Sequence, residues 1–404
     1  MAYVIPFQAI RPAKDKAEHI AALPYDVMNT KEAKEEIARE PLSFLSIDRP
    51  ETNFPDGQDM YAPEVYEKAK AIFDEMLSNG DFIQDEKSFY YIYELTMEGR
   101  AQTGITALCS ASDYDDQVIK KHENTLAAKE QDRIRHISTL RAQTGPIFLA
   151  YRKDEVISRI TEAYKKKIPV YDFTSPDNIT HRVWVIDGEA DIESIKIRFE
   201  GINEIYIADG HHRCASAVKV CKELPKEKRY FMSVLFPDEE LKIYDYNRVV
   251  KDLNGLSESR FFDRLRKKYT VTREGSGAIH PERKGQMTMY ISGVWYRLDV
   301  RSEFIVDDPV SSLDVSILQN EVLSPLLNIE DPKTDPRIGF VGGIRGLSEL
   351  EKLVDSGSYE VAFAMYPTSI DELFAVADAG RLMPPKSTWF EPKLRSGLFI
   401  NRFE

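Results

Sequence analysis

The chain is poor in cysteine, has no long apolar run and carries no excess of positive charge. Its 404 residues include only three cysteines, Cys109, Cys214 and Cys221, and none belongs to a Cys-x-x-Cys pair. This argues against a disulfide framework and is typical of a reducing compartment. No apolar run approaches membrane-spanning length, and the first residues lack a signal-peptide pattern. We therefore expect a cytoplasmic protein without a membrane partner.

The charge balance excludes one further class of partner. The net charge is −13, from 54 basic and 67 acidic residues. A broad nucleic-acid-binding face needs clustered positive charge, so we expect no nucleic-acid partner, although a local basic pocket is compatible with this composition. The hydrophobic share of 42% and the charged share of 30% are those of a soluble globular protein.

Hydrophobic patterning predicts an α/β (α+β) protein with two regions, residues 1–250 and a smaller α+β region at 251–404. Helical spacing in the stretch 62–80 predicts a helix that has Pro63 in its first turn and is stopped by Gly80. Strand-like runs around Glu98-Gly99-Arg100 predict a hairpin. The stretch "SFLSIDRPE", residues 43–51, is predicted as a strand.

The most informative stretch is "EIYIADGHHRCASAVKV", residues 204–220, which predicts a buried strand followed by a helix. The corner between them is a helix N-terminus, and free backbone N–H groups there attract anions. Gly210 would let the backbone approach an anion closely, and Arg213 would grip phosphate or carboxylate. Asp209 would repel a bare phosphate, so we expect it to hold Mg²⁺ or to orient a substrate hydroxyl.

Two other interpretations of this corner stay open. Asp209 would simply cap the helix, with the histidines as polar surface; the clustering of charged and titratable side chains favours a functional site instead. A zinc site would use His122, His211 and His212, but adjacent histidines rarely point at one metal.

A second corner, "KKHENTLAAKEQDR", has the same arrangement of a short strand and a helix. Asn124 or Thr125 would cap the helix, and Lys129 and Arg133, four residues apart, would share a face. Glu123 at the helix start is a candidate general base for an attacking hydroxyl. An ordinary capped helix with a salt-bridged surface is an equal alternative.

Three other segments are weaker candidates. "LPYDVM" places Tyr25 and Asp26 at a corner that faces the site or simply packs. The loop Lys386-Ser387-Thr388 and the glycines of 339–343 would serve a ligand, but structural turns and docking of the tail are favoured for both.

These motifs resemble known families. Gly-x-His-Arg after a strand resembles the phosphate loop of sulfiredoxin and the box of ParB-type partition proteins, and "ADGHHR" is similar to free serine kinases built on that fold. The whole chain resembles the family catalogued as domain of unknown function 1015. The matching pieces are "PFQAIRP", "LPYDVM", "HENTLAAKEQDR", "GPIFLAY", "IADGHHRCASA", "GFVGG", "AFAMYPTS" and "MPPKSTWFEPKLRSGL".

The resemblance implies a ParB/sulfiredoxin-like nucleotide-binding core in residues 1–250. It implies phosphoryl transfer from ATP or ADP, with Mg²⁺, to the hydroxyl of a small molecule, with free L-serine as the first guess. A non-catalytic nucleotide-binding regulator of the ParB type is the alternative.

In the kinase interpretation, each candidate residue has a role. The phosphates would be held by Gly210, His211 and Arg213, with Lys129 and Arg133 neutralising charge. The candidate catalytic residues are Glu123, Asp209 and His212. The carboxylates of Glu123 and Asp209 should then lie within roughly 10 Å of each other. If they do not, Asp26 and Asp132 are the next candidates for the base.

Overall fold

The computed structural model describes residues 1–403, which form two compact units. The first unit comprises Met1–Leu241 together with Pro392–Glu404, and the second is Lys242–Glu391. Hydrophobic patterning predicts this division near residue 250 and leaves the final residues in the second region. The last segment instead belongs to the first unit, where Leu398, Phe399 and Ile400 are completely buried. Within residues 1–403, no helix has the length and apolar character that crossing a membrane requires.

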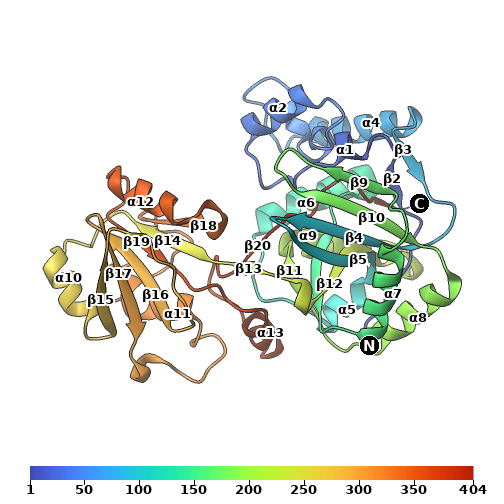
Figure 1. Ribbon diagram of the computed structural model, residues 1–404. Coiled ribbons are helices and arrows are strands. Elements are labelled where there is room, and N and C mark those ends of the chain that lie inside the picture. The colour runs from blue at the N-terminus through green and yellow to red at the C-terminus, as the bar shows by residue number, and fades with distance from the viewer. Residues whose placement is uncertain (404) are drawn as a thin grey trace. The chain divides into compact units, whose positions relative to one another are not determined.

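A nine-stranded mixed sheet forms the centre of the first unit (Figure 1). Its order is β6-β11-β8-β12-β5-β4-β10-β9, with β1 beside β5, and only β6·β11 and β8·β12 are parallel pairs. The strands are β1 (Val4–Ile5), β4 (Tyr90–Met97), β5 (Arg100–Ser110), β6 (Ile119–Lys120), β8 (Ile147–Tyr151), β9 (Tyr171–Thr174), β10 (Thr180–Ile186), β11 (Ile205–Asp209) and β12 (Tyr230–Pro237). The predicted α/β (α+β) class is confirmed.

The predicted hairpin is present between β4 and β5. Its two turn residues, Glu98 and Gly99, have φ angles of 52° and 80°. Two successive positive φ angles match the right-handed twist of the flanking strands in a two-residue turn. Glycine at the second position adopts this conformation without a steric penalty.

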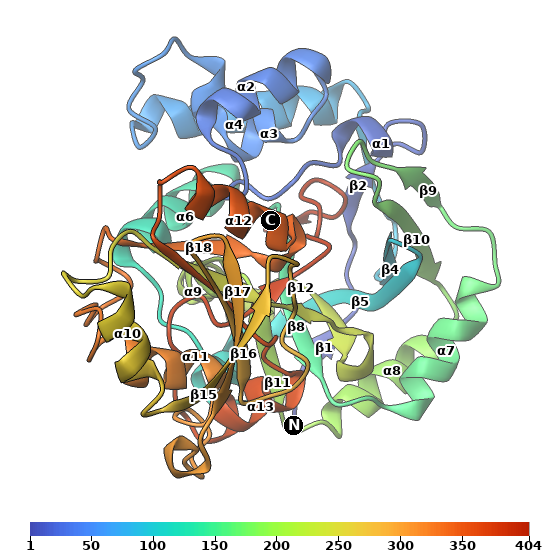
Figure 2. The same cartoon turned by 60° about the vertical axis from the view of Figure 1, so that its left-hand side comes forward.

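Helices cover this sheet, and the helices of the N-terminal part of the chain form a cluster of their own (Figure 2). Pro63 lies in the first turn of α4, as predicted, and is its first residue. Asn29 caps α2 in a capping box with Glu32. The helices are α1 (Ala17–Ile20), α2 (Thr30–Arg39), α3 (Leu45–Asp48), α4 (Pro63–Ser78), α5 (Ala111–Asp115), α6 (Ala127–Leu140), α7 (Glu155–Lys165), α8 (Glu189–Glu200) and α9 (His211–Cys221), with short 3₁₀ turns η1 (Pro50–Asn53), η2 (Lys226–Lys228) and η3 (Asp238–Glu240).

The strand predicted over residues 43–51 is wrong, because this stretch forms α3 and η1. Phe44, Leu45 and Ile47 are all completely buried in the core of the N-terminal helices. Their spacing of one and two residues fits one face of a helical turn, whereas a half-buried strand would alternate. Pro50 then starts the 3₁₀ turn.

The last segment of the first unit is held by backbone pairing and by one buried cation. Ile400 pairs with Ile10, and β21 (Asn401–Arg402) pairs with β7 (Ala142–Gln143). Near them β2 (Ile10–Pro12) pairs with β3 (Phe82–Gln84). Arg395, only 4% exposed, donates to both carboxylate oxygens of Asp177 at 2.5 Å. This anchor fixes the segment on the first unit.

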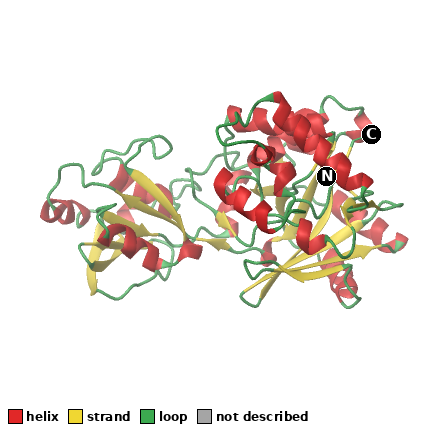
Figure 3. Cartoon of the chain, turned by 90° about the horizontal axis from the view of Figure 1, so that it is seen from above, coloured by secondary structure: helices red, strands yellow, loops and turns green. Residues whose placement is uncertain are grey.

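The second unit is built on a six-stranded antiparallel sheet in the order β15-β17-β16-β19-β14-β18. Both units combine helices with strands (Figure 3). The strands are β13 (Ile243–Tyr244), β14 (Tyr246–Val250), β15 (Tyr269–Gly275), β16 (Gln286–Ile291), β17 (Val294–Val300), β18 (Ile338–Gly342), β19 (Val361–Ala364) and β20 (Trp389–Phe390), where β13 pairs with β20. The helices are α10 (Glu258–Leu265), α11 (Asp314–Leu318), α12 (Leu347–Asp355) and α13 (Ile370–Asp378), with the short 3₁₀ turns η4 (Ser302–Phe304) and η6 (Gly343–Arg345) and the π-helix η5 (Gln319–Leu323).

The glycines of 339–343 have a packing role in the second unit. A Cβ atom on Gly342 would lie 3.0 Å from the Trp389 ring, and one on Gly343 would lie 1.9 Å from Asp245 Oδ1. Any larger residue would displace these neighbours. This agrees with the structural interpretation of the "GFVGG" stretch.

Candidate functional site

The two polar corners lie at one edge of the central sheet. Strands β6 and β11 are parallel neighbours, with Ile119 opposite Ile205. His122 and Glu123 follow β6, and Asp209 ends β11. Because parallel strands present their carboxyl ends at the same edge, both corners open on the same side. Helices α6 and α9, which follow them, pack against each other.

Asp209 has both carboxylate oxygens engaged. Oδ1 accepts a hydrogen bond from the backbone N–H of Gly210 at 2.7 Å, and Oδ2 accepts one from Lys393 Nζ at 2.9 Å. Burial alone would raise the pKa of Asp209, but the charges of Lys393 and Arg213 hold it well below its usual range. Asp209 is therefore a carboxylate at neutral pH, paired with a lysine from the last segment of the unit.

The histidines of the two corners pack against each other in neutral form. The rings of His122 and His211 meet edge to face at 4.5 Å between centroids. Burial lowers the pKa of His122 to about 4 and lowers that of His211 well below its ordinary value. His211 Nδ1 lies 3.9 Å from Glu123 Oε2, while His212 Nε2 accepts from the Leu126 N–H at 2.9 Å. Glu123 and Asp209 thus lie at the same sheet edge as the two histidines.

The arrangement does not fit a protein-built metal centre. Within residues 1–403, no three His, Cys, Asp or Glu side chains are grouped to hold a metal ion. The edge-to-face packing of His122 and His211 does not direct both rings at one point. Both oxygens of Asp209 already accept hydrogen bonds. The geometry therefore gives no support to the zinc interpretation or to the predicted Mg²⁺ role of Asp209.

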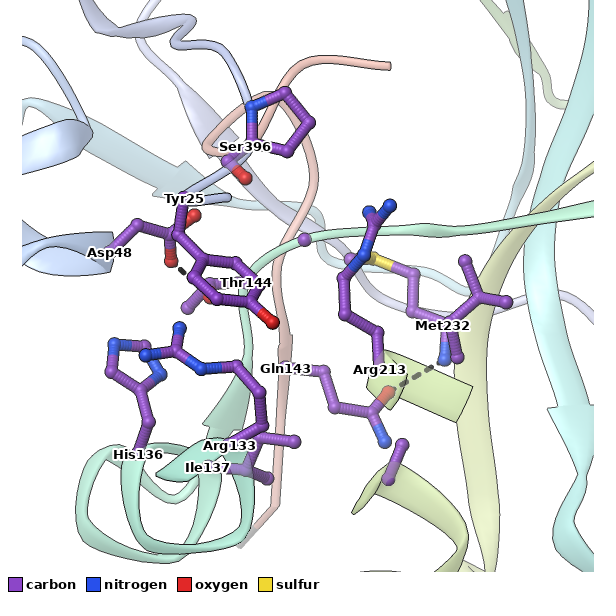
Figure 4. A pocket seen from close by; sticks show the side chains of 14 residues that line it. Tyr25, Asp48, Arg133, His136, Ile137, Gln143, Thr144, Arg213, Met232 and Ser396 are labelled. Carbon is purple, nitrogen blue, oxygen red and sulfur yellow. Dashed lines mark hydrogen bonds between the residues drawn. The ribbon is translucent and has the colours of Figure 1, made fainter. Parts of the chain in front are cut away.

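A pocket opens in the first unit between α6, α9 and the loop at Tyr25 (Figure 4). The space inside it that can hold the centre of a water molecule is about 30 Å³, and the figure rises to about 460 Å³ only when all space between the atoms and the open solvent at its mouth are counted. In the close-up, the Tyr25 ring lies between the guanidinium groups of Arg133 and Arg213. The lining residues are Pro24, Tyr25, Asp48, Arg133, His136, Ile137, Gln143, Thr144, Gly145, Ile147, Arg213, Ala217, Met232 and Ser396.

Arg133 is held on one side of this pocket by buried contacts. Its guanidinium carbon lies 3.9 Å from the centroid of the Tyr25 ring. Its Nε donates to Asp132 Oδ2 at 2.8 Å, and the other oxygen of Asp132 accepts from the Tyr66 hydroxyl at 2.8 Å. Burial raises the pKa of Tyr25 to about 12, so its phenol stays protonated and able to donate. Arg133 thus presents a fixed positive charge to the pocket.

Arg213 connects the pocket to the start of α9. Its Nη1 donates to the Pro146 carbonyl at 2.6 Å. A Cβ atom on Gly210 would lie 3.1 Å from Arg213 Nε, and the φ angle of Gly210 is 86°. Glycine is therefore required here for its backbone conformation and for the space that Arg213 occupies. Lys129, by contrast, is exposed and does not line the pocket.

The start of α6 differs from the prediction. Leu126 is the N-cap residue, and no side chain caps the helix, whereas Asn124 or Thr125 was expected to do so. The Thr125 hydroxyl bonds to Glu130 instead. The helix thus begins one to two residues later than predicted, because the polar corner is occupied by contacts with α9.

Several pocket and corner residues were missed from the sequence. Asp48, in α3, accepts from the Thr144 hydroxyl at 2.9 Å, and His136 Nε2 donates to the Ile47 carbonyl at 2.9 Å. His136 lies three residues after Arg133 on α6, and this spacing predicts that the two side chains share one face of the helix. Ser396 and Lys393 come from the last segment, and no local pattern placed them near residue 209.

The Lys386-Ser387-Thr388 loop lies in the second unit and forms turn contacts there. The Lys386 carbonyl accepts from Arg248 Nη2 at 3.0 Å, and the Ser387 hydroxyl donates to the Pro384 carbonyl at 2.6 Å. These bonds agree with the structural interpretation of this loop.

Comparisons with known proteins identify a family and give distant structural similarities. The profile of the family described as "Protein of unknown function (DUF1015)" matches residues 4–316. No curated protein matches the chain. A free serine kinase mutant in complex with AMP is 13% identical and covers 72% of this chain and 91% of its own, with a TM-score of 0.36.

Two further solved structures are similar at the same level. A conserved hypothetical protein from Pyrococcus furiosus is 16% identical, covers 73% of this chain and 94% of its own, and has a TM-score of 0.35. SbnI with a C-terminal truncation, from Staphylococcus aureus, is 12% identical, covers 72% of this chain and 87% of its own, and has a TM-score of 0.38. Scores this low transfer no activity and no ligand to this chain.

Proposed function

We propose a function for this chain, which belongs to the DUF1015 family. The pocket beside Arg133 and Arg213 binds the phosphates of a nucleotide, ATP or ADP. The protein then transfers a phosphoryl group to the hydroxyl of a small molecule. One observation carries this proposal: two guanidinium groups approach one pocket next to the amino end of α9.

The chemistry of these groups supports phosphate as the ligand. Guanidinium ions bind phosphate oxygens through two parallel hydrogen bonds, and they stay charged at any physiological pH. The first N–H groups of a helix have no partner within the helix and attract anions. The protein has a net charge of −13, but two arginines line this one pocket. Their positive charge suits an anionic ligand.

Glu123 is the proposed general base for the acceptor hydroxyl. Its side chain is 42% exposed and lies at the same sheet edge as Asp209. His211, whose pKa burial holds well below its ordinary value, lies 3.9 Å from Glu123 Oε2 as a neutral imidazole. L-serine is the first acceptor to test, because "ADGHHR" resembles the loop of free serine kinases. Mg²⁺ would enter as the counterion of the nucleotide phosphates, without a dedicated protein cage.

A turnover assay tests this proposal. The protein is incubated with ATP or ADP and with L-serine or other small hydroxyl compounds, and nucleotide consumption and phosphorylated product are measured by mass spectrometry. We expect consumption only when a suitable acceptor is present. Nucleotide binding without consumption for any acceptor would instead support a non-catalytic nucleotide-binding regulator. Absence of nucleotide binding would contradict both functions.

A further inference from the structure

We propose that Lys393 is a phosphate-binding residue of this site and that Asp209 positions it. The inference rests on the proposed nucleotide site and adds to it a residue beyond the 4–316 range of the family match. Lys393 Nζ lies 2.9 Å from Asp209 Oδ2, and the lysine side chain is 18% exposed.

The pair resolves a contradiction in the corner sequence. A lone carboxylate at a helix N-terminus would repel a phosphate that binds there. Paired with Lys393, Asp209 no longer adds net negative charge to the corner. Its other oxygen is fixed by the Gly210 N–H at 2.7 Å, so the carboxylate has a defined orientation. Asp209 thereby holds the ammonium group of Lys393 beside the first turn of α9.

Docking of the last segment does not explain this contact. Arg395, two residues later, already binds Asp177, the Ser175 hydroxyl and His181 in a buried cluster. Completely buried apolar side chains follow it, namely Leu398, Phe399 and Ile400. A partly exposed ion pair adds little stability to such an anchor. The position of Lys393 at the corner therefore calls for a different role.

Lysine chemistry suits that role. An ammonium group is a compact charge with three donors, so it can bind a carboxylate and a phosphate oxygen at the same time. Lys393 would approach the phosphate from the Asp209 side, and Arg213 from the pocket side. Both charges already act on Asp209 strongly enough to lower its pKa. A phosphate at the corner would thus meet two cations from segments 180 residues apart in the chain (393 − 213).

The test measures binding of ATP and of inorganic tripolyphosphate by calorimetry. Lys393→Met should weaken both about 10- to 150-fold, the equivalent of one charge-assisted hydrogen bond. Lys393→Arg, which keeps the charge, should restore most of the affinity. Asp209→Ala should weaken binding in the wild-type background, but add little to Lys393→Met, because its effect acts through the lysine.

Controls separate this inference from the proposed function. Lys222→Met removes another lysine that forms an ion pair, with Asp115 at 2.9 Å near the opposite end of α9, and should leave both affinities unchanged. If the wild type binds neither probe, the proposed function fails. If it binds both and Lys393→Met binds equally well, only the role of Lys393 is overturned. Equal weakening of adenosine, which has no phosphate, would also overturn that role by showing a general structural effect.

Discussion

The guanidinium carbon of Arg133 lies 3.9 Å from the centroid of the Tyr25 ring, and Asp132 binds the same guanidinium from the side. Tyr66, from α4, fixes Asp132 in turn. Arg133, Asp132 and Tyr66 are each at most 7% exposed. A buried ion pair is costly to desolvate and adds little net stability. We therefore interpret this network as a means of holding one cation in a fixed position at the pocket.

Tyr66→Phe tests that interpretation. The variant removes one hydrogen bond to the Asp132 carboxylate and should lower the free energy of unfolding by about 1–3 kcal/mol. Because Arg133 would be less well fixed, nucleotide affinity should fall about 3- to 10-fold, a loss on the order of 1 kcal/mol. Tyr164→Phe, which removes a hydroxyl bonded to Asp191 at 3.1 Å, is the matched control and should not change affinity. Unchanged affinity in Tyr66→Phe would show that Arg133 does not need this support.

Arg213→Ala should weaken nucleotide binding by about 1.5–3 kcal/mol, the range for a hydrogen bond to a charged group. The affinity is measured by calorimetry, with Arg159→Ala, an exposed arginine of α7, as the control. Wild-type affinity in Arg213→Ala would place the phosphates elsewhere.

Glu123→Gln should keep nucleotide affinity and lose most turnover, because an amide cannot accept the proton of the attacking hydroxyl. Binding and turnover are measured on the same preparation, and Glu162→Gln on α7 is the control. Full turnover in Glu123→Gln would rule out this base. Asp132 would be a poor replacement because it is bound to Arg133 and Tyr66, so Asp26, which is exposed, would be tested next.

We expect the free energy of unfolding of the second unit to depend on pH because of the buried carboxyl group of Asp314. Burial raises the pKa of this carboxyl from 3.8 to about 7. Between these values the folded state binds more protons than the unfolded state, so the free energy of unfolding falls as pH rises, and becomes constant above about pH 7.

Asp314→Asn should remove this fall, because the amide is uncharged and its oxygen can still accept from the Gly285 N–H. At pH 8 the variant should be more stable than the wild type by roughly 2–4 kcal/mol, and the difference should shrink toward pH 4. Urea unfolding followed by tryptophan fluorescence measures this. A stability difference that does not change with pH would contradict the prediction.

The sequence patterns predicted correctly those features that depend on interactions between residues close together in the chain. Pro63 marked the start of α4, and Glu98-Gly99 marked a turn that needs positive φ angles. Strand β11 (Ile205–Asp209) and the helix after Gly210 followed from the change in apolar spacing. Each of these features depends on residues within a few positions of one another.

Other features depend on partners far away in the chain, and the sequence did not reveal them. The turn at 44–47 is helical because its apolar side chains are buried among the N-terminal helices. Lys393 reaches Asp209 across 184 positions, and no periodicity encodes such a contact. Lys129 and Arg133 were grouped by helical spacing, but burial separates them: Lys129 is exposed, whereas Arg133 is 7% exposed. Which face of α6 meets the pocket is a tertiary property.

The return of residues 392–403 to the first unit sets an order of assembly during synthesis. The second unit is one continuous stretch, Lys242–Glu391, so all of it leaves the ribosome before the last strand of the first unit. The pairing of Ile10 with Ile400 joins residues near the two ends of the sequence. Contacts between residues so far apart in the chain form slowly. The first unit therefore lacks the buried side chains of Phe399 and Ile400 until the 150 residues (391 − 242 + 1) of the second unit have been added. During that interval the apolar surface of the first unit that these side chains later cover is exposed, and such surface favours aggregation or binding by chaperones.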